Sequence, residues 1–174
     1  GAGHAAGQVV ASLRHHKFDG QIALVGDEPY LPYHRPPLSK KYLSGEMPAE
    51  RLYVKPESFY EDPAIDLQLD TRIAAIDRSA KCLKIEGGAD IPYDKLVLAT
   101  GSRVRRLHIE GASLKSVHYL RSIADVDAIR GDMDSGKKAV IIGAGYIGLE
   151  VAAVAQQAGL NVTVVEMADR VMSR

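Results

Sequence analysis

The stretch Lys138–Glu166 constrains the fold of this chain more than any other. It begins with the β-branched run Ala139–Ile142, which is short and apolar, as is typical of a buried parallel strand. Three glycines follow at GxGxxG spacing, and apolar residues then recur at helical spacing until Gly159. A second apolar run, Asn161–Val165, leads directly to Glu166. This order of strand, glycines, helix, strand and acid predicts one βαβ unit of a parallel sheet.

The same stretch predicts a dinucleotide-binding site. Gly143 permits the tight turn, Gly145 lets the backbone approach a pyrophosphate, and Gly148 allows the helix and strand to pack closely. The start of the helix then offers free N–H groups and a positive dipole end to the phosphates. Glu166 follows at about the distance where a carboxylate accepts hydrogen bonds from the adenosine ribose hydroxyls. A glycine-rich turn in some other α/β unit is the alternative that this pattern leaves open.

A second fingerprint stands at the beginning of the chain. The first six residues, GAGHAA, repeat the pattern with Ala6 in the place of the third glycine, which is an allowed variant. A helix to about His15 and a strand over Gln21–Val25 are expected to follow. Asp27 and Glu28 then supply the acid at the end of that strand. The two fingerprints are the only internal repeat that we identify.

Composition narrows the class of protein. The 174 residues allow one domain or the beginning of two, and 22 Lys and Arg balance 22 Asp and Glu, so no basic field suggests nucleic acid. No apolar run reaches the ~18–20 residues of a membrane span, and we expect a cytoplasmic protein without a metal site. Cys82 is the only cysteine, which excludes an internal disulfide or a CxxC redox pair. No strand precedes Gly1 and few residues follow Glu166, so we expect a segment of a longer protein, truncated at both ends.

The segment Tyr30–Leu43, YLPYHRPPLSKKYL, is predicted to be a stiff extended loop because its prolines forbid a regular central strand. A short helix from Leu38 to about Leu43 can end it. The loop carries Arg35 and Lys40, and a solvated surface turn is the alternative interpretation.

The residues between this loop and the second fingerprint predict an antiparallel meander that returns to the parallel sheet. Its hairpin turns fall at Ser79-Ala80 and Gly87-Gly88, and the returning strand Lys95–Ala99 ends in the small residues Thr100 and Gly101. The expected strands are Arg72–Ile76, Cys82–Glu86, Ile91–Ala99 and Ser113–Leu120, and the expected helical segments are Glu50–Pro63 and Asp125–Arg130.

Taken in order, these motifs resemble the two-dinucleotide-fold flavoproteins, and most closely the NADH-dependent ferredoxin reductases of the putidaredoxin reductase and rubredoxin reductase type. The stretches that carry the resemblance are PYHRPPLSK (32–40), LVLATGSR (96–103), HYLR (118–121) and VIIGAGYIGLEVA (140–152). Apoptosis-inducing factor shares much of this pattern. The resemblance implies an α/β, Rossmann-like fold of the glutathione reductase type with a three-stranded antiparallel β-meander. It also implies an FAD-binding domain over 1–115 and the start of an NAD-binding domain over 116–174.

The resemblance further implies that the first fingerprint binds FAD and the second binds NAD(H). A valine, Val104, stands where these relatives often have proline. The cofactor-binding residues that it predicts before the second fingerprint are Gly1, Gly3, Ala5, Ala6, Asp27, Glu28, Arg35, Lys40, Ile73, Ala99, Thr100, Gly101 and Arg121. Those that it predicts in the second fingerprint are Gly143, Gly145, Tyr146, Ile147, Gly148, Glu150 and Glu166.

Lys40 and Glu150 are the predicted catalytic pair. In the matching family positions these side chains meet beside the isoalloxazine ring, where the ammonium stabilises negative charge on reduced flavin and the carboxylate offsets its burial. A carboxylate that is merely favoured by the helix dipole is the alternative for Glu150. Glu166 favours NADH, because a carboxylate repels a 2′-phosphate, although Arg170 nearby can soften that preference.

The function that the resemblance implies is an FAD-dependent NADH:ferredoxin oxidoreductase. It would pass electrons to a [2Fe–2S] ferredoxin or a rubredoxin that supplies an oxygenase such as a cytochrome P450. A dithiol relay needs a cysteine pair between residues 35 and 43, and this segment has none. The alternative is an NADH-sensing flavoprotein of the apoptosis-inducing-factor type with a signalling or scaffold role.

Overall fold

The computed structural model describes residues 1–173 and divides into two compact units. The first unit contains residues 1–34 and 53–102, and the second contains residues 35–52 and the chain from 103 onward. Each unit has one of the two fingerprints. The division of the chain into cofactor-binding domains near residue 115 stays a prediction.

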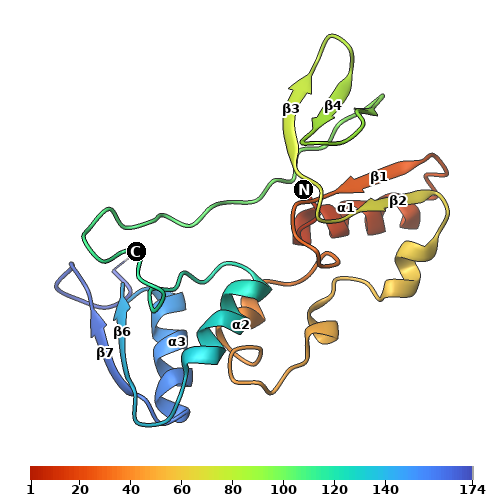
Figure 1. The fold of residues 1–174 in the computed structure, drawn as a ribbon. Helices are drawn as coiled ribbons and strands as arrows, with labels where there is room; N and C mark the ends of the chain where they lie inside the picture. Colours follow the sequence, from red (N-terminus) through yellow and green to blue (C-terminus); the bar gives the residue numbers. More distant parts are fainter. Residues whose placement is uncertain (174) are drawn as a thin grey trace. The chain divides into compact units, whose positions relative to one another are not determined.

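The first unit is built around a helix and two parallel strands, which lie side by side in Figure 1. Helix α1 spans His4–His15, β1 spans Ile22–Val25 and β2 spans Ile65–Gln68, with Ile22 paired to Ile65 in parallel register. The apolar face of α1 packs against β1, as the helical spacing of its apolar residues predicts. Their shared core consists of Ala6, Val10, Leu24, Tyr60 and Ile65. The strand β2 was not predicted, because its alternation of apolar residues is only four residues long.

The predicted antiparallel meander is confirmed. Strands β3 (Ile73–Asp77), β4 (Cys82–Ile85) and β5 (Ile91–Pro92) form a three-stranded sheet in that order (Figure 1). The carboxylate of Asp77 accepts hydrogen bonds from the backbone N–H groups of the first turn, and Gly87, with φ of +74°, provides the left-handed residue in the second.

Two predicted strands are wrong. Residues Lys95–Ala99 and Ser113–Leu120 are not in strands. A strand is held by a ladder of hydrogen bonds to a neighbour, and among the described residues β1 pairs only with β2. Without such a neighbour, the β-branched and apolar side chains of Val97 and Leu98 remain 60% and 65% exposed.

The connecting loop forms 3₁₀ turns where longer helices were predicted. The first, η1, spans Pro36–Ser39, and two more span Ala49–Leu52 and Glu57–Glu61. The two prolines that begin η1 fix the backbone φ of the turn and offer no N–H to continue a ladder. The apolar residues of the loop are nevertheless buried, with Leu38 and Leu52 at 1% and 0% exposure.

The second unit contains the strand–helix–strand arrangement that the sequence predicts. Helix α2 (Ile123–Asp132) precedes β6 (Lys138–Ile142), α3 (Tyr146–Gln157) and β7 (Asn161–Val165). The two strands are parallel, and α3 packs against both of them (Figure 1). Gly159 follows α3 with φ of +86°, the left-handed conformation expected of a C-terminal cap. Among the helices described, none combines the length and apolar character that crossing a bilayer requires.

Candidate functional site

The glycine turn of the first unit lies against two other segments that carry predicted cofactor-binding residues. A Cβ added to Gly1 would lie 2.3 Å from the Ala99 carbonyl oxygen and 3.1 Å from the Cα of Thr100. A Cβ added to Gly26, at the end of β1, would lie 2.5 Å from the Cβ of Ala2. Backbone approaches this close are why the turn is built from small residues. Gly101, with φ of +69°, lets the chain turn after Thr100.

The acids of the first unit differ in their surroundings. Asp27 is exposed, with the Arg72 guanidinium 3.9 Å from its carboxylate. Glu28 is turned inward instead, and the Tyr33 hydroxyl donates a hydrogen bond of 2.5 Å to it. Arg72 immediately precedes Ile73, the first residue of β3, so Asp27 lies near the start of the strand that carries the predicted cofactor-binding residue Ile73. Asp27 has the exposed carboxylate that a ribose needs, and Glu28 has a structural partner.

The three glycines of the second fingerprint differ in the space around them. Two of them border open space, and the third packs tightly against the turn. Gly143 has φ of +104°, and a Cβ added to Gly143 or to Gly145 would have no atom within 4 Å. A Cβ added to Gly148 would lie 2.0 Å from the Gly143 carbonyl oxygen. The helix therefore packs directly on the turn at its third glycine, and the first two border open space. This is the cradle that a pyrophosphate requires.

The helix starts provide an independent test of whether a dinucleotide fits. Helix α2 is closed by its own capping box, in which Ser122 and Asp125 satisfy each other's backbone N–H groups. Helices α1 and α3 begin at Gly3 and Gly145, which provide no side-chain hydrogen bond to the first turn. The N–H groups of those two turns are the ones that phosphates would satisfy. The residues present thus fit two dinucleotides, one at each fingerprint.

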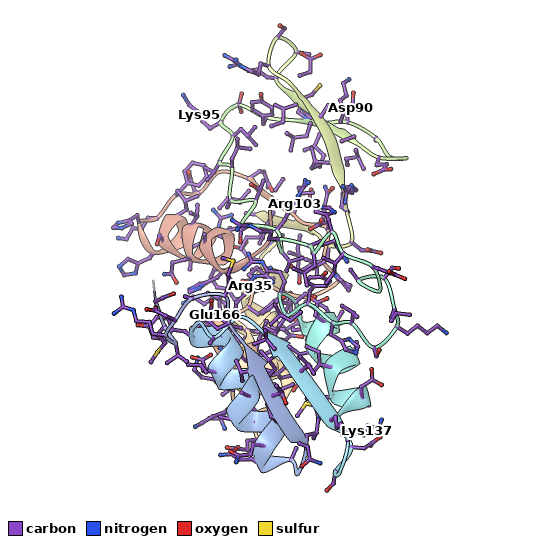
Figure 2. The ribbon with its side chains drawn as sticks, turned by 90° about the vertical axis from the view of Figure 1, so that its left-hand side faces the viewer. Arg35, Asp90, Lys95, Arg103, Lys137 and Glu166 are labelled. Atoms are coloured by element: carbon purple, nitrogen blue, oxygen red, sulfur yellow. The ribbon has the colours of Figure 1, made fainter. Side chains whose placement is uncertain are left out.

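Glu166 is held at the end of β7, beside the glycine turn. One carboxylate oxygen accepts a hydrogen bond of 2.7 Å from the Ala144 N–H, and the other accepts from the N–H groups of Met167 and Ala168. Figure 2 shows Glu166 and Lys137 at opposite ends of the β6–β7 pair, so the acid lies at the carboxyl ends of the strands. Ligands of parallel α/β sheets bind at that end.

A charged cluster lies beside the N-terminal half of α3. The Lys40 ammonium lies 2.8 Å from one oxygen of Glu150, and the Ser39 hydroxyl donates a hydrogen bond of 2.5 Å to the other. The hydrogen bonds from Lys40 and from Ser39 lower the pKa of Glu150, so the carboxylate stays ionised to a lower pH than an ordinary glutamate. The two side chains that the resemblance predicts to meet are therefore in contact.

Arg35 and Arg121 also lie together in the second unit. The Arg35 guanidinium donates a hydrogen bond of 2.6 Å to the Arg121 carbonyl oxygen. Tyr146 and Ile147, the first two residues of α3, are 67% and 56% exposed and border the open glycine turn. An exposed aromatic ring at that place can cover a flat ligand group.

The predicted site residues are divided between the two units. The first group contains Gly1, Gly3, Ala5, Ala6, Asp27, Glu28, Ile73, Ala99, Thr100 and Gly101, and the second contains Arg35, Lys40, Arg121, Gly143, Gly145, Tyr146, Ile147, Gly148, Glu150 and Glu166. Sequence reasoning missed Ser39. Its only signal was its place directly before Lys40 in the RPPLSK stretch. The roles of these residues in binding or catalysis stay predictions.

Comparison with known proteins identifies the family. The model of the pyridine nucleotide-disulphide oxidoreductases matches residues 1–174. The chain belongs to this family. Rhodocoxin reductase of Rhodococcus erythropolis is 47% identical over 174 residues, which are 100% of this chain and 41% of the relative.

Solved structures agree with this assignment. The ferredoxin reductase for the CYP199A2 system from Rhodopseudomonas palustris has a TM-score of 0.93 and 49% identity over 99% of this chain and 43% of that one. The covalent putidaredoxin reductase–putidaredoxin complex gives a TM-score of 0.94 and 42% identity over 100% of this chain and 42% of that one. The chain therefore spans about two fifths of the length of these relatives.

These findings confirm the predicted fold class and the predicted resemblance to ferredoxin reductases. The prediction of FAD and a nicotinamide dinucleotide as cofactors agrees with the family and with the two uncapped helix starts. The relatives named here are reductases, which favours the electron-transfer interpretation over the signalling alternative.

Proposed function

We propose that this chain is the cofactor-binding part of a flavoprotein reductase that carries electrons from NADH through FAD to a small iron–sulfur protein. The acceptor is a [2Fe–2S] ferredoxin or a rubredoxin, which in turn supplies an oxygenase such as a cytochrome P450. The ion pair between Lys40 and Glu150, 2.8 Å apart beside the N-terminal half of α3, is the observation that carries this proposal. The protein works in the cytoplasm, without membrane or nucleic-acid partners.

The residues of each unit have distinct tasks in this proposal. FAD is held on the turn Gly1–Ala6 with Asp27 at its ribose, and NADH is held on the turn Gly143–Gly148. When bound, the two cofactors supply hydride transfer and its conversion into single electrons. The Lys40 ammonium would stabilise negative charge on the reduced flavin, and Glu150 keeps that ammonium in place.

Glu166 selects NADH over NADPH in this proposal. A carboxylate at this position accepts hydrogen bonds from a free ribose hydroxyl and repels a 2′-phosphate. Its three backbone hydrogen bonds hold the carboxylate in place at the edge of the turn.

The lone cysteine argues against the dithiol chemistry that the family name includes. Cys82 is buried in β4, where it contacts the sheet of the meander. A dithiol relay beside the flavin needs two cysteines in the loop that carries Lys40, and residues 35–43 contain none. The absence of a cysteine pair in this loop supports the proposal that electrons leave the flavin for an external acceptor.

Stopped-flow absorbance of the full-length, FAD-loaded protein tests the proposal. We expect fast bleaching of the flavin by NADH, slow bleaching by NADPH, and reoxidation when a [2Fe–2S] ferredoxin is added. Slow bleaching by NADH with a long-lived charge-transfer band that ferredoxin does not affect would instead support the NADH-sensing alternative. Glu166→Gln serves as the matched variant for the choice between the two nucleotides.

A further inference from the structure

The carboxylate of Glu150 is held by two consecutive residues of one turn. Ser39, the last residue of η1, donates its hydroxyl to one oxygen over 2.5 Å, and Lys40 contacts the other oxygen over 2.8 Å. Because the donors are adjacent in the chain, the backbone of the turn fixes the distance between them. Both oxygens of Glu150 are therefore engaged from the same side of α3.

The two donors differ in how firmly they are placed. The side chain of Lys40 is 49% exposed, and its ammonium has a second acceptor in the Pro36 carbonyl oxygen at 3.2 Å. Ser39 is only 4% exposed, and apart from tyrosines it is the one buried residue of the described chain with a polar side chain. A buried hydroxyl has few alternative partners, and a long exposed ammonium has many. Ser39 is consequently the most firmly placed side chain of this cluster.

We propose that Ser39 is a positioning residue for the proposed NADH-to-flavin reaction: it fixes Glu150, and through Glu150 it holds the Lys40 ammonium. Without the Ser39 hydroxyl, the carboxylate can rotate toward solvent and Lys40 can turn to the Pro36 carbonyl. This inference rests on the proposed function, since Lys40 has a catalytic task only there.

The other charged groups packed around this turn already have partners in the same unit. Asp127 of α2 accepts a hydrogen bond of 2.9 Å from Tyr42, and Asp125 is used in the capping box of α2. Arg35 at the start of the turn donates to the Arg121 carbonyl oxygen. The charge of Glu150 is therefore set by Lys40 and Ser39, whose hydrogen bonds lower its pKa in that order.

The consequence of removing Ser39 has a definite sign. A hydrogen bond to the ionised form lowers the pKa of a carboxyl group, so losing it raises the pKa of Glu150. As pH falls, Glu150 would then take up its proton at a higher pH than in the wild type, and Lys40 would lose its partner earlier. The rate of flavin reduction by NADH would fall over the same pH range.

The test compares Ser39→Ala with Ser39→Thr, which keeps the hydroxyl, and with Ser44→Ala. Ser44 is the matched control, because its exposed hydroxyl also donates to a carboxylate, Glu46, at 2.8 Å. In the full-length protein, the fall in the flavin-reduction rate on acidification, which lies below about pH 5, should shift to higher pH in Ser39→Ala by up to about one pH unit. That shift is a tenfold change in proton concentration, the lower range for a charged hydrogen bond. Ser39→Thr and Ser44→Ala should keep the wild-type pH profile.

A second readout is independent of turnover. The Glu150 carboxyl signal is followed against pH by ¹³C NMR in the full-length protein without cofactor, with Glu150→Gln to assign it. We expect its titration to move to higher pH in Ser39→Ala only. An unmoved titration overturns the inference, even if the rate changes. Failure of NADH to reduce the wild-type flavin would overturn the proposed function instead, while the NMR titration would still report on the three side chains.

Discussion

The two fingerprints share the same glycine-turn backbone but differ in the side chains around it. Aligned on their first glycines, Ala6 corresponds to Gly148 and Gln8 corresponds to Glu150. Gln8 is an exposed neutral residue, whereas Glu150 is ionised and held by Ser39 and Lys40. The first helix start offers its uncapped backbone N–H groups. The second helix also carries a charge pair, to which the proposed function assigns the chemical step.

The acids at the strand ends differ in the same way. Asp27 has no hydrogen bond to its own glycine turn among the described contacts, and the Arg72 guanidinium lies 3.9 Å from its carboxylate. Glu166 accepts a hydrogen bond from Ala144 in the middle of its turn. The Asp27 carboxylate is therefore open to a ligand, whereas the Glu166 carboxylate already binds backbone N–H groups of and beside its turn. The second fingerprint depends on its acid before any nucleotide arrives.

The largest expected effect concerns Gly148, the glycine of the second fingerprint that packs against its own turn. Gly148→Ala would place a methyl group 2.0 Å from the Gly143 carbonyl oxygen, a backbone atom that cannot move aside. We expect a loss of about 3 kcal/mol or more in the free energy of unfolding of the second unit, measured by denaturant titration.

Gly145→Ala is the matched control for this substitution. Its added methyl group meets nothing within 4 Å, and the residue has an ordinary φ of −78°. This variant should unfold like the wild type and yet bind NADH more weakly, because the methyl group occupies space left for the pyrophosphate. Equal stability of Gly148→Ala and Gly145→Ala would contradict the division into open and closed glycines.

The same comparison explains which parts of the fold and of the candidate site the sequence could predict. The strand–helix–strand of the second fingerprint was predicted to within a residue or two, because its signals are local: β-branched runs, glycines and a C-terminal cap. The strand Lys95–Ala99 was predicted wrongly, because strand formation depends on a neighbour that local residues do not reveal. Ser39 was missed for a related reason, since it lies 111 positions from Glu150 in the chain and no local pattern marks the contact.

The next effect in size concerns the charge pair that only the second fingerprint carries. Lys40→Ala should slow flavin reduction by NADH about tenfold, which corresponds to the loss of ~1.4 kcal/mol of transition-state stabilisation, and should leave FAD binding nearly unchanged. Lys41→Ala, at the exposed neighbouring lysine, is the control. Stopped-flow reduction and a fluorescence titration with FAD measure the two quantities. A rate equal to that of the wild type would remove Lys40 from the proposed site.

A smaller effect separates the two acids. Asp27→Asn should weaken FAD binding by about tenfold or less without changing the thermal unfolding of the protein without cofactor, since its carboxylate is exposed. Glu166→Gln should weaken NADH binding by a similar factor and should also lower the unfolding temperature, because Glu166 accepts hydrogen bonds from Ala144, Met167 and Ala168. Calorimetric titration and thermal scans measure both. If the two substitutions lower the unfolding temperature equally, the acids do not differ as argued.

The smallest effect lies in the core of the first unit, under α1. The Tyr60 hydroxyl is buried and has no hydrogen-bond partner among the described residues, and burial raises the pKa of Tyr60 to about 12. A group whose folded-state pKa lies above its unfolded value of about 10 reduces stability as pH rises from about 10 to about 12, because the unfolded chain then loses the proton first. Tyr60→Phe should therefore be neutral or stabilising by up to about 1 kcal/mol near neutral pH, and its stability should fall less steeply above about pH 10. Denaturant titrations of Tyr60→Phe and the wild type across that range measure both differences. A marked destabilisation near neutral pH would mean that the hydroxyl has a partner, and the first unit would then contain a polar contact in its core comparable to that of Ser39 in the second.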